Sequence, residues 1–264
     1  MTMFSWFGRL NPCIRDWRGK RIWLIGASAG IGAELARQFA QQGAQLALSA
    51  RNLEALSQLS QELPGSRALA LDLQDNQSVQ QAFQHLMHEW DQIDLVLIVA
   101  GNYQAMRAED FDLQQAQQLL DINLHGVYRC LDLVLPQLIR QAQGGIGIVA
   151  SVAGYSGLPK ALVYGPSKAA LINLCESLYF DLHPKNLAVY LINPGFVATR
   201  LTEKNDFKMP ALIDTQTAAR AIVDGLEAGQ FHIHFPKRFT NFLRLARLLP
   251  YRSYFYLLHK VTGL

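Results

Sequence analysis

The chain has 264 residues, of which half are apolar and 17% are charged, and its formal net charge is only +3. This composition excludes a disordered or collagen-like chain and supplies enough apolar residues for a sizeable core. Because the length suits one doubly wound α/β domain, we expect residues 1–264 to form a single domain.

The three cysteines, Cys13, Cys130 and Cys175, are far apart and lack CxxC spacing, and the histidines are not clustered. This pattern predicts neither a metal site nor a disulfide framework. The opening segment MTMFSWFGRL lacks the basic start and long apolar core of a signal peptide. We therefore expect a cytoplasmic protein in a reducing setting.

Short apolar runs alternate with longer segments of helical periodicity. Strands buried on both faces are continuous apolar runs, and spacers of a dozen or more residues suit crossover helices. The pattern predicts an α/β, Rossmann-like fold, with a doubly wound, mostly parallel sheet and helices on both faces. Seven strands are expected, at residues 21–27, 44–50, 67–71, 94–101, 145–151, 187–195 and 231–236.

A glycine-rich turn follows the first expected strand, in IGASAGIG, with Gly26, Gly30 and Gly32 before a helix that begins near Ile31. Glycines allow a tight turn and a close approach to a pyrophosphate, which the helix N-terminus then attracts. The spacing is GxxxGxG, and a glycine-rich turn with only a structural role is the alternative.

The second expected strand ends in SARN, with Ala50 followed by Arg51. An acid at this position would bind the ribose 2′-OH and repel a 2′-phosphate, whereas the arginine fork suits phosphate. The sequence therefore favours NADP(H), and NAD(H) remains possible because Arg51 can equally be a solvated loop charge.

The stretch YGPSK places Tyr164 and Lys168 four residues apart, on one face of an expected helix. Pro166 is tolerated only near the first turn, so the pair should open this helix at the edge of a cleft. We expect the ammonium to lower the pKa of the phenol, which would then act as a general acid and base.

Two more polar residues are expected near this pair. Ser151 ends the fifth expected strand, where a hydroxyl can orient a substrate carbonyl. Asn123, in LLDINLHGVY, is expected on a long helix, where it could anchor a water molecule in a proton relay.

With these motifs in this order, and with a strand-end AG and an NPG, the chain resembles the short-chain dehydrogenases/reductases over roughly residues 18–236. The resemblance implies a catalytic tetrad of Asn123, Ser151, Tyr164 and Lys168, and a homodimer or homotetramer. Lys168 would also hold the ribose of the cofactor. Further cofactor contacts are implied at Gly26, Ser28, Gly30, Ile31, Gly32, Arg51, Asp72, Leu73, Ala100, Gly101, Tyr164, Pro194, Gly195, Val197 and Thr199.

The chain departs from the family pattern at two places. Ile25 stands where the family usually has threonine, and Ile98–Gly101 reads IVAG where the family often has NNAG. Both changes replace polar groups that brace the central strands, and we interpret them as structural substitutions that leave the tetrad intact.

The substrate is expected to be a small carbonyl or alcohol compound of apolar character. An apolar pocket wall is predicted from Phe207 and Met209, in the segment after NPG, together with Tyr155, Leu158 and Leu162. These side chains can equally pack against the body of the protein.

Residues 237–264 form an extension that the dehydrogenase core does not require, with six lysines and arginines and no acid. Its apolar segments are interrupted at Pro250 and are shorter than the roughly 20 residues that span a bilayer. A basic amphipathic helix with aromatic residues can lie on the cytoplasmic face of a membrane, whereas the alternative is that it covers a groove or a subunit interface. Its many apolar residues argue against nucleic-acid binding.

The sequence thus predicts an NADP(H)-dependent oxidoreductase that moves a hydride between nicotinamide and a carbonyl or alcohol carbon. The alternative function is a non-catalytic nucleotide-binding sensor or a membrane-associated scaffold that retains the fold. Because such a protein would be expected to lose Tyr164 or Lys168, the presence of both favours the enzyme.

Overall fold

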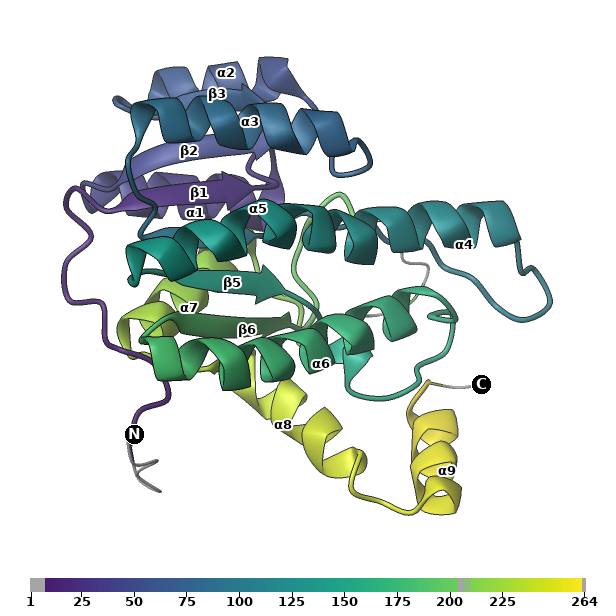
Figure 1. Cartoon of the computed structure of the whole chain (residues 1–264). Coiled ribbons are helices and arrows are strands. Elements are labelled where there is room, and N and C mark those ends of the chain that lie inside the picture. The colour runs from purple at the N-terminus through teal and green to yellow at the C-terminus, as the bar shows by residue number, and fades with distance from the viewer. Residues whose placement is uncertain (1–7, 204–206, 208, 263–264) are drawn as a thin grey trace.

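The computed structural model describes residues 8–203, 207 and 209–262. One sheet of seven parallel strands lies at its centre, in the order β3-β2-β1-β4-β5-β6-β7, and all seven predicted strands are present (Figure 1). The strands are β1 Arg21–Ile25, β2 Gln45–Ala50, β3 Arg67–Ala70, β4 Leu95–Ile98, β5 Gly145–Val149, β6 Ala188–Pro194 and β7 His232–Phe235.

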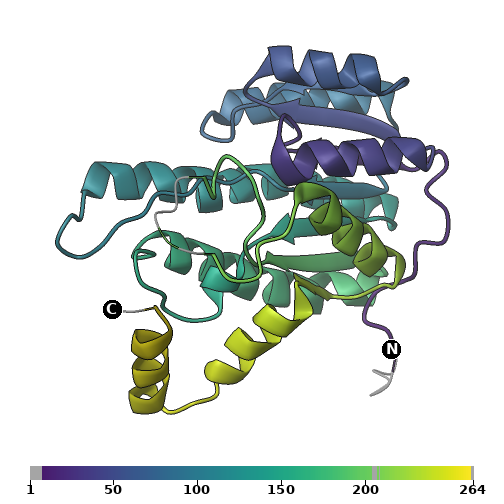
Figure 2. The ribbon, with the colours of Figure 1, turned by 180° about the vertical axis from the view of Figure 1, so that it is seen from behind.

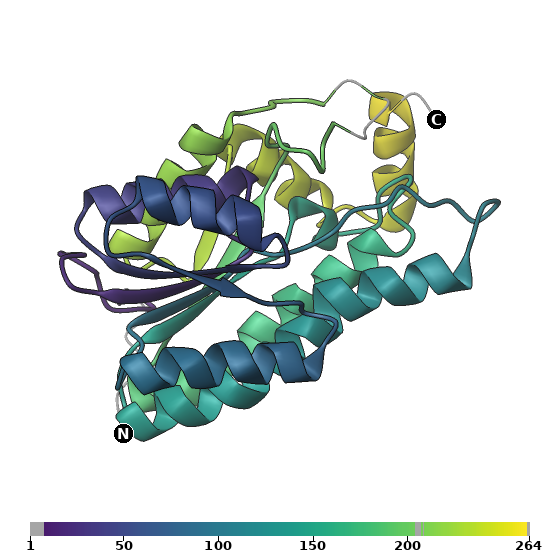
Figure 3. The same ribbon diagram turned by 90° about the horizontal axis from the view of Figure 1, so that it is seen from above.

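Helices pack on both faces of this sheet, as Figure 3 shows from above. Alternate side chains of β1 enter two separate cores, Trp23 and Ile25 on one face and Ile22 and Leu24 on the other, because successive strand residues point in opposite directions. The first face is covered by α3 Asn76–Glu89, α5 Gly126–Gln141 and α6 Tyr164–Leu182, and the second by α1 Gly30–Gln41, α2 Leu53–Glu62 and α7 Thr215–Glu227.

The strand order reverses between β1 and β4, because β2 and β3 are added on one side of β1 and β4 on the other. A crevice opens at such a switch point, beyond the carboxyl ends of the strands. At this point the end of β1 is bonded to the segment after β4. The Ile25 carbonyl oxygen accepts hydrogen bonds from the backbone N–H groups of Val99 and Ala100 at 2.8 and 2.9 Å. Backbone groups thus join β1 and β4 where the sequence lacks the expected polar side chains.

The long helix expected before β5 is interrupted by a π-helical turn, Asp121–His125, between α4 Leu113–Leu120 and α5. Such turns insert one residue into the helical repeat and are frequent at functional sites. Asn123 lies in this turn and is fully buried.

The last two helices, α8 Lys237–Ala246 and α9 Tyr251–Thr262, follow β7 and meet at the predicted break beside Pro250. Thr240, Leu243 and Ala246 form the buried stripe of α8, at the three-residue spacing of one helical face. Figure 2 shows both helices at the side of the molecule where the described chain ends. In the described part of the chain, every helix is too short or too polar to cross a bilayer.

Candidate active site

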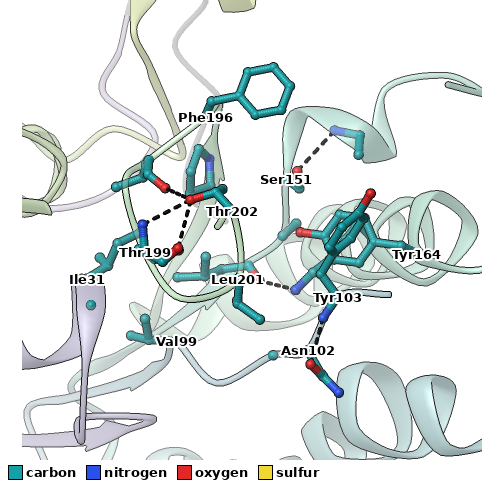
Figure 4. A pocket seen from close by; sticks show the side chains of 18 of the residues that line it. Ile31, Val99, Asn102, Tyr103, Ser151, Tyr164, Phe196, Thr199, Leu201 and Thr202 are labelled. Atoms are coloured by element: carbon teal, nitrogen blue, oxygen red, sulfur yellow. Dashed lines mark hydrogen bonds between the residues drawn. The ribbon is translucent and has the colours of Figure 1, made fainter. Parts of the chain in front are cut away.

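A cavity of about 1240 Å³ lies beyond the carboxyl ends of the strands. Pockets for one small ligand usually measure roughly 300–1,000 Å³, so this cavity has room for a cofactor and a substrate together. Its wall contains every residue that the resemblance implied for cofactor contact, from Gly26 to Thr199. In Figure 4, Tyr103, Ser151 and Tyr164 lie on one side of the cavity, across from Ile31 and Thr199.

In the glycine-rich turn after β1, the positions of Gly26 and Gly32 leave no space for a side chain. Gly26 has a φ of +99°, and a Cβ there would lie 2.5 Å from the Ala100 nitrogen. A Cβ on Gly32 would lie 2.1 Å from the Gly26 carbonyl oxygen, so α1 can pack against β1 only with glycine at this position. Among the described residues, no side chain caps the N–H groups at the start of α1, and these groups lie at the cavity as potential anion-binding donors.

Arg51 stands at the other end of this part of the cavity, directly after β2. Its side chain is exposed, and within the described residues it forms no hydrogen bond or ion pair. Asp72 and Leu73 follow β3 beside it, where the Asp72 carboxylate accepts a hydrogen bond from the Gln74 N–H at 3.0 Å. The fork of Arg51 is thus available to a phosphate group at the cavity edge.

Tyr164 and Lys168 open α6, as the sequence predicted. The Lys168 ammonium donates a hydrogen bond to the Val149 carbonyl oxygen at 2.9 Å and lies 5.8 Å from the centre of the Tyr164 ring. Ser151 follows β5, and its Oγ accepts a hydrogen bond from the Ala153 N–H at 3.1 Å. The ends of β5 and α6 therefore bring the serine, tyrosine and lysine to one wall of the cavity.

The pKa of Tyr164 differs from the sequence-based expectation. Burial raises it, and a hydrogen bond with the Ser151 hydroxyl only partly opposes this rise. Lys168, which was expected to lower the phenol pKa, is itself buried, and desolvation lowers its own pKa to about 8. The phenol is therefore protonated at neutral pH.

Asn123 does not line the cavity but supports it from behind. Its Oδ1 accepts a hydrogen bond from the Asn102 N–H at 2.7 Å, and its Nδ2 donates to the Asn102 carbonyl oxygen at 2.9 Å and to Ser167 Oγ at 3.3 Å. These bonds tie the π-helical turn to the segment after β4 and to α6. Asn123 thereby links the backbone at Asn102 to Ser167, the residue before Lys168 on α6.

Tyr103 is a cavity residue that the sequence motifs did not indicate. Its ring packs edge-on against the ring of Tyr164, with the centres 5.1 Å apart. It follows the strand-end AG of β4, and its place beyond a parallel strand was the signal that could have identified it.

The predicted substrate residues lie in different environments. Leu158 and Phe207 line the cavity, whereas Tyr155, Leu162 and Met209 are not among the lining residues. The Tyr155 side chain is buried, and its hydroxyl is 3.0 Å from His232 Nε2. Leu162 is 44% exposed, and its N–H donates a hydrogen bond to the Met106 carbonyl oxygen at 3.3 Å. Apolar character alone could not separate wall residues from packing residues.

The C-terminal extension also forms part of the cavity wall, and its residues were not among the predicted substrate residues. An aromatic row joins it to the segment after β6, since Phe196 packs against both Phe207 and Phe239 with ring centres 5.7 Å apart in each pair. The lining residues from the extension are Phe239, Phe242, Leu243, Leu258, Val261 and Thr262.

Comparison with known proteins agrees with this architecture. The family model described as short chain dehydrogenase matches residues 20–209. An uncharacterized oxidoreductase of Myxococcus xanthus is 31% identical over 231 residues, covering 86% of this chain and 91% of the relative. A 3-oxoacyl-(acyl-carrier-protein) reductase of Thermotoga maritima is 31% identical over 195 residues, covering 70% of this chain and 77% of the relative.

A solved short-chain dehydrogenase/reductase of Burkholderia phymatum, in complex with NAD, superimposes with a TM-score of 0.81 at 20% identity. The match covers 88% of this chain and 94% of that structure. The chain therefore belongs to the short-chain dehydrogenase family, whose members are oxidoreductases that use NAD(P)(H) and act on CH–OH and C=O groups.

Proposed function

We propose that this protein is an NADP(H)-preferring oxidoreductase that interconverts a carbonyl group and an alcohol on an apolar small molecule. The single observation that carries the proposal is the cavity, which joins the glycine turn and Arg51 at one end to Ser151, Tyr164 and Lys168 at the other. NAD(H) would enter the same cavity but would leave Arg51 without a phosphate partner.

In the reduction direction, the Tyr164 hydroxyl donates its proton to the carbonyl oxygen, and the Ser151 hydroxyl donates a hydrogen bond to the same oxygen. A bound nicotinamide supplies the hydride, or accepts it in the reverse direction. Because burial raises the pKa of Tyr164, the phenol retains its proton until the substrate oxygen becomes more basic. Lys168, as a cation, stabilises the phenolate that remains.

The substrate is proposed to be lipophilic, because the wall beyond Tyr164 is formed by Leu158, Phe207 and the inward side chains of α8 and α9. Burial of apolar substrate surface against them would supply most of the binding free energy, at about 25 cal/mol per Å². Tyr103 would limit the space beside the reacting carbon from the other side.

The assembly is proposed to be a homodimer or homotetramer in the cytoplasm, with residues 18–236 as the dehydrogenase core and 237–264 as an added extension. Tyr128 and Ile139 on α5 and Phe180 on α6 are 50%, 45% and 73% exposed. Exposed apolar side chains on adjacent helices favour a subunit contact there.

The experiment that tests the cofactor preference is a fluorescence titration with NADPH and with NADH. We expect at least tenfold tighter binding of NADPH, and Arg51→Gln should abolish this difference by weakening NADPH alone, because a charge-assisted bond to phosphate contributes about 1.5–3 kcal/mol. Arg220→Gln, which removes an exposed arginine on α7 outside the cavity, is the matched control. Equal affinities in the parent protein would contradict the preference.

The variant Tyr164→Phe tests the catalytic role of the tyrosine separately from cofactor binding. This variant should bind NADPH as the parent does but should lose reduction of apolar ketones and aldehydes by several orders of magnitude. A parent protein that binds NADPH yet reduces none of these compounds would favour the sensor or scaffold alternative.

A further inference from the structure

Exposed apolar side chains are concentrated on the last two helices and the short connection between them. Eight of the 19 large apolar side chains exposed among the described residues lie between residues 237 and 262, about a tenth of the chain. Leu248, Tyr251 and Tyr256 are 79%, 80% and 72% exposed, which is more than side chains of this size usually are. We call this set the outer apolar surface: Phe242, Leu245, Leu248, Leu249, Tyr251, Phe255, Tyr256 and Val261.

Inward contacts hold the two helices in the orientation that exposes this surface. On α8, Thr240 is fully buried, and its Oγ1 lies 2.6 Å from His234 Nδ1. On α9, Tyr254 is 4% exposed, and its hydroxyl lies 2.8 Å from Ser156 Oγ and donates to the Gly157 carbonyl oxygen at 2.7 Å. Six members of the outer apolar surface consequently lie outside the cavity lining, while Phe242 and Val261 lie at its edge. Figures 1 and 2 show α9 set apart from the sheet and its covering helices.

The charged side chains around the outer apolar surface are all positive. Arg244, Arg247, Arg252 and Lys260 are exposed between its members, and residues 237–262 contain no acid. Among the described residues, no carboxylate forms an ion pair with any of these four side chains. Association of two such surfaces in a symmetric pair would bring like charges together, which disfavours a second copy of this chain as the partner.

We propose that the outer apolar surface docks this protein on an anionic phospholipid bilayer. Tyrosine, phenylalanine and leucine side chains beside arginine and lysine suit the boundary between headgroups and acyl chains, where the rings and aliphatic groups enter and the cations stay with the phosphates. Each Lys or Arg near an anionic leaflet adds attraction, so the apolar and the charged parts of the surface act together.

The proposal links the membrane to the cavity, because the same helices form both surfaces. Phe242 and Val261 belong to the outer apolar surface and also line the cavity, while Leu243 and Leu258 line it from the buried side. A lipophilic substrate dissolved in the bilayer would therefore reach the cavity beside these two helices without crossing water. The docking itself does not depend on the proposed reaction, so it is tested in the absence of cofactor and substrate.

The test is sedimentation of the full-length protein with phosphatidylcholine vesicles, with or without phosphatidylserine. We expect binding to the mixed vesicles, at least tenfold weaker binding to phosphatidylcholine alone, and loss of the difference at high salt. Leu248→Gln combined with Phe255→Gln should weaken binding to mixed vesicles at least tenfold. Arg247→Gln combined with Arg252→Gln should weaken binding to mixed vesicles but not to phosphatidylcholine.

Leu113→Gln is the matched control, because Leu113 is 61% exposed on α4, outside the extension, and this variant should bind vesicles as the parent does. The melting temperature of each variant is measured to verify folding. The proposal is overturned if the parent protein stays in the supernatant with mixed vesicles, or if the Leu248 and Phe255 changes leave binding unaltered. It is also overturned if those changes convert a dimer to a monomer in analytical ultracentrifugation, because the surface would then be a subunit contact.

Discussion

Lys168 is 3% exposed, and its ammonium donates to the Val149 carbonyl oxygen inside the protein. Desolvation lowers its pKa from 10.5 to about 8, a gap that corresponds to roughly 3 kcal/mol of folding free energy. Because the unfolded chain binds more protons between these two values, stability rises with pH from about 8 to 10.5, and the cost is present in full below pH 8.

Lys168→Met should therefore raise the melting temperature of the cofactor-free protein at pH 7, by about 3 °C or more, since loss of the bond to Val149 offsets about 1 kcal/mol of the gain. The gain should shrink between pH 8 and 10, where the parent lysine also becomes neutral. Scanning fluorimetry over this range measures both effects. A variant that is less stable than the parent at pH 7 would show that the ammonium stabilises the fold.

At the scale of elements, two neutral histidines connect β7 to its neighbours: His232 to Tyr155 and to Asn193 on β6, and His234 to α8. His232 Nε2 lies 3.0 Å from the Tyr155 hydroxyl and accepts from Asn193 Nδ2 at 2.9 Å, whereas His234 lies between Thr240 and Arg244. Burial, with a smaller effect of the nearby cations Lys237 and Arg244, lowers the pKa of His232 to about 3 and that of His234 to about 4. Between these values and 6.5 the unfolded chain binds more protons than the folded chain. The histidines therefore leave the free energy of unfolding at its full value above pH 6.5 and reduce it as the pH falls toward 4.

We therefore expect the melting temperature to fall by several degrees between pH 6.5 and 5, and His232→Gln combined with His234→Gln to flatten this fall. The glutamine side chains remain neutral over the whole range and can still accept hydrogen bonds. His88→Gln, an exposed change on α3, is the control and should keep the parent profile. Identical pH profiles for the parent protein and the double variant would exclude this explanation of acid sensitivity.

At the scale of the whole molecule, the cavity is assembled from segments that are far apart in sequence. The glycine turn comes from the first strand, Tyr164 and Lys168 from α6, and the far wall from α8 and α9. A change in the last helices should therefore alter substrate binding without altering cofactor binding.

Phe242→Ala tests this division. It removes an aromatic ring from the substrate end, so KM for bulky apolar ketones should rise about tenfold, in line with roughly 1.5 kcal/mol of lost apolar contact, while the NADPH affinity stays unchanged. Phe255→Ala, on α9 but outside the cavity lining, should leave KM unaltered when no lipid is present. An unchanged KM for Phe242→Ala would place the substrate away from α8.

The seven strands, the glycine turn and the start of α6 at Tyr164 could be predicted from the sequence, because each depends on local chemistry. Continuous apolar runs specify buried parallel strands, glycine specifies a turn without side chains, and YxxxK with an early proline specifies a helix start. The break beside Pro250 was predicted for the same reason.

The tertiary structure decided which side chains share a surface and what surrounds them. It placed Tyr155 beside His232 and away from the cavity, set Asn123 behind Asn102, brought Tyr103 against Tyr164, and buried Lys168 so that its pKa falls. These features depend on contacts between residues that are distant in the chain, so they cannot be predicted from the periodicity of any single segment. Which face of the C-terminal extension forms the cavity wall and which faces outward was decided in the same way, by the packing of α8 and α9 on the rest of the protein.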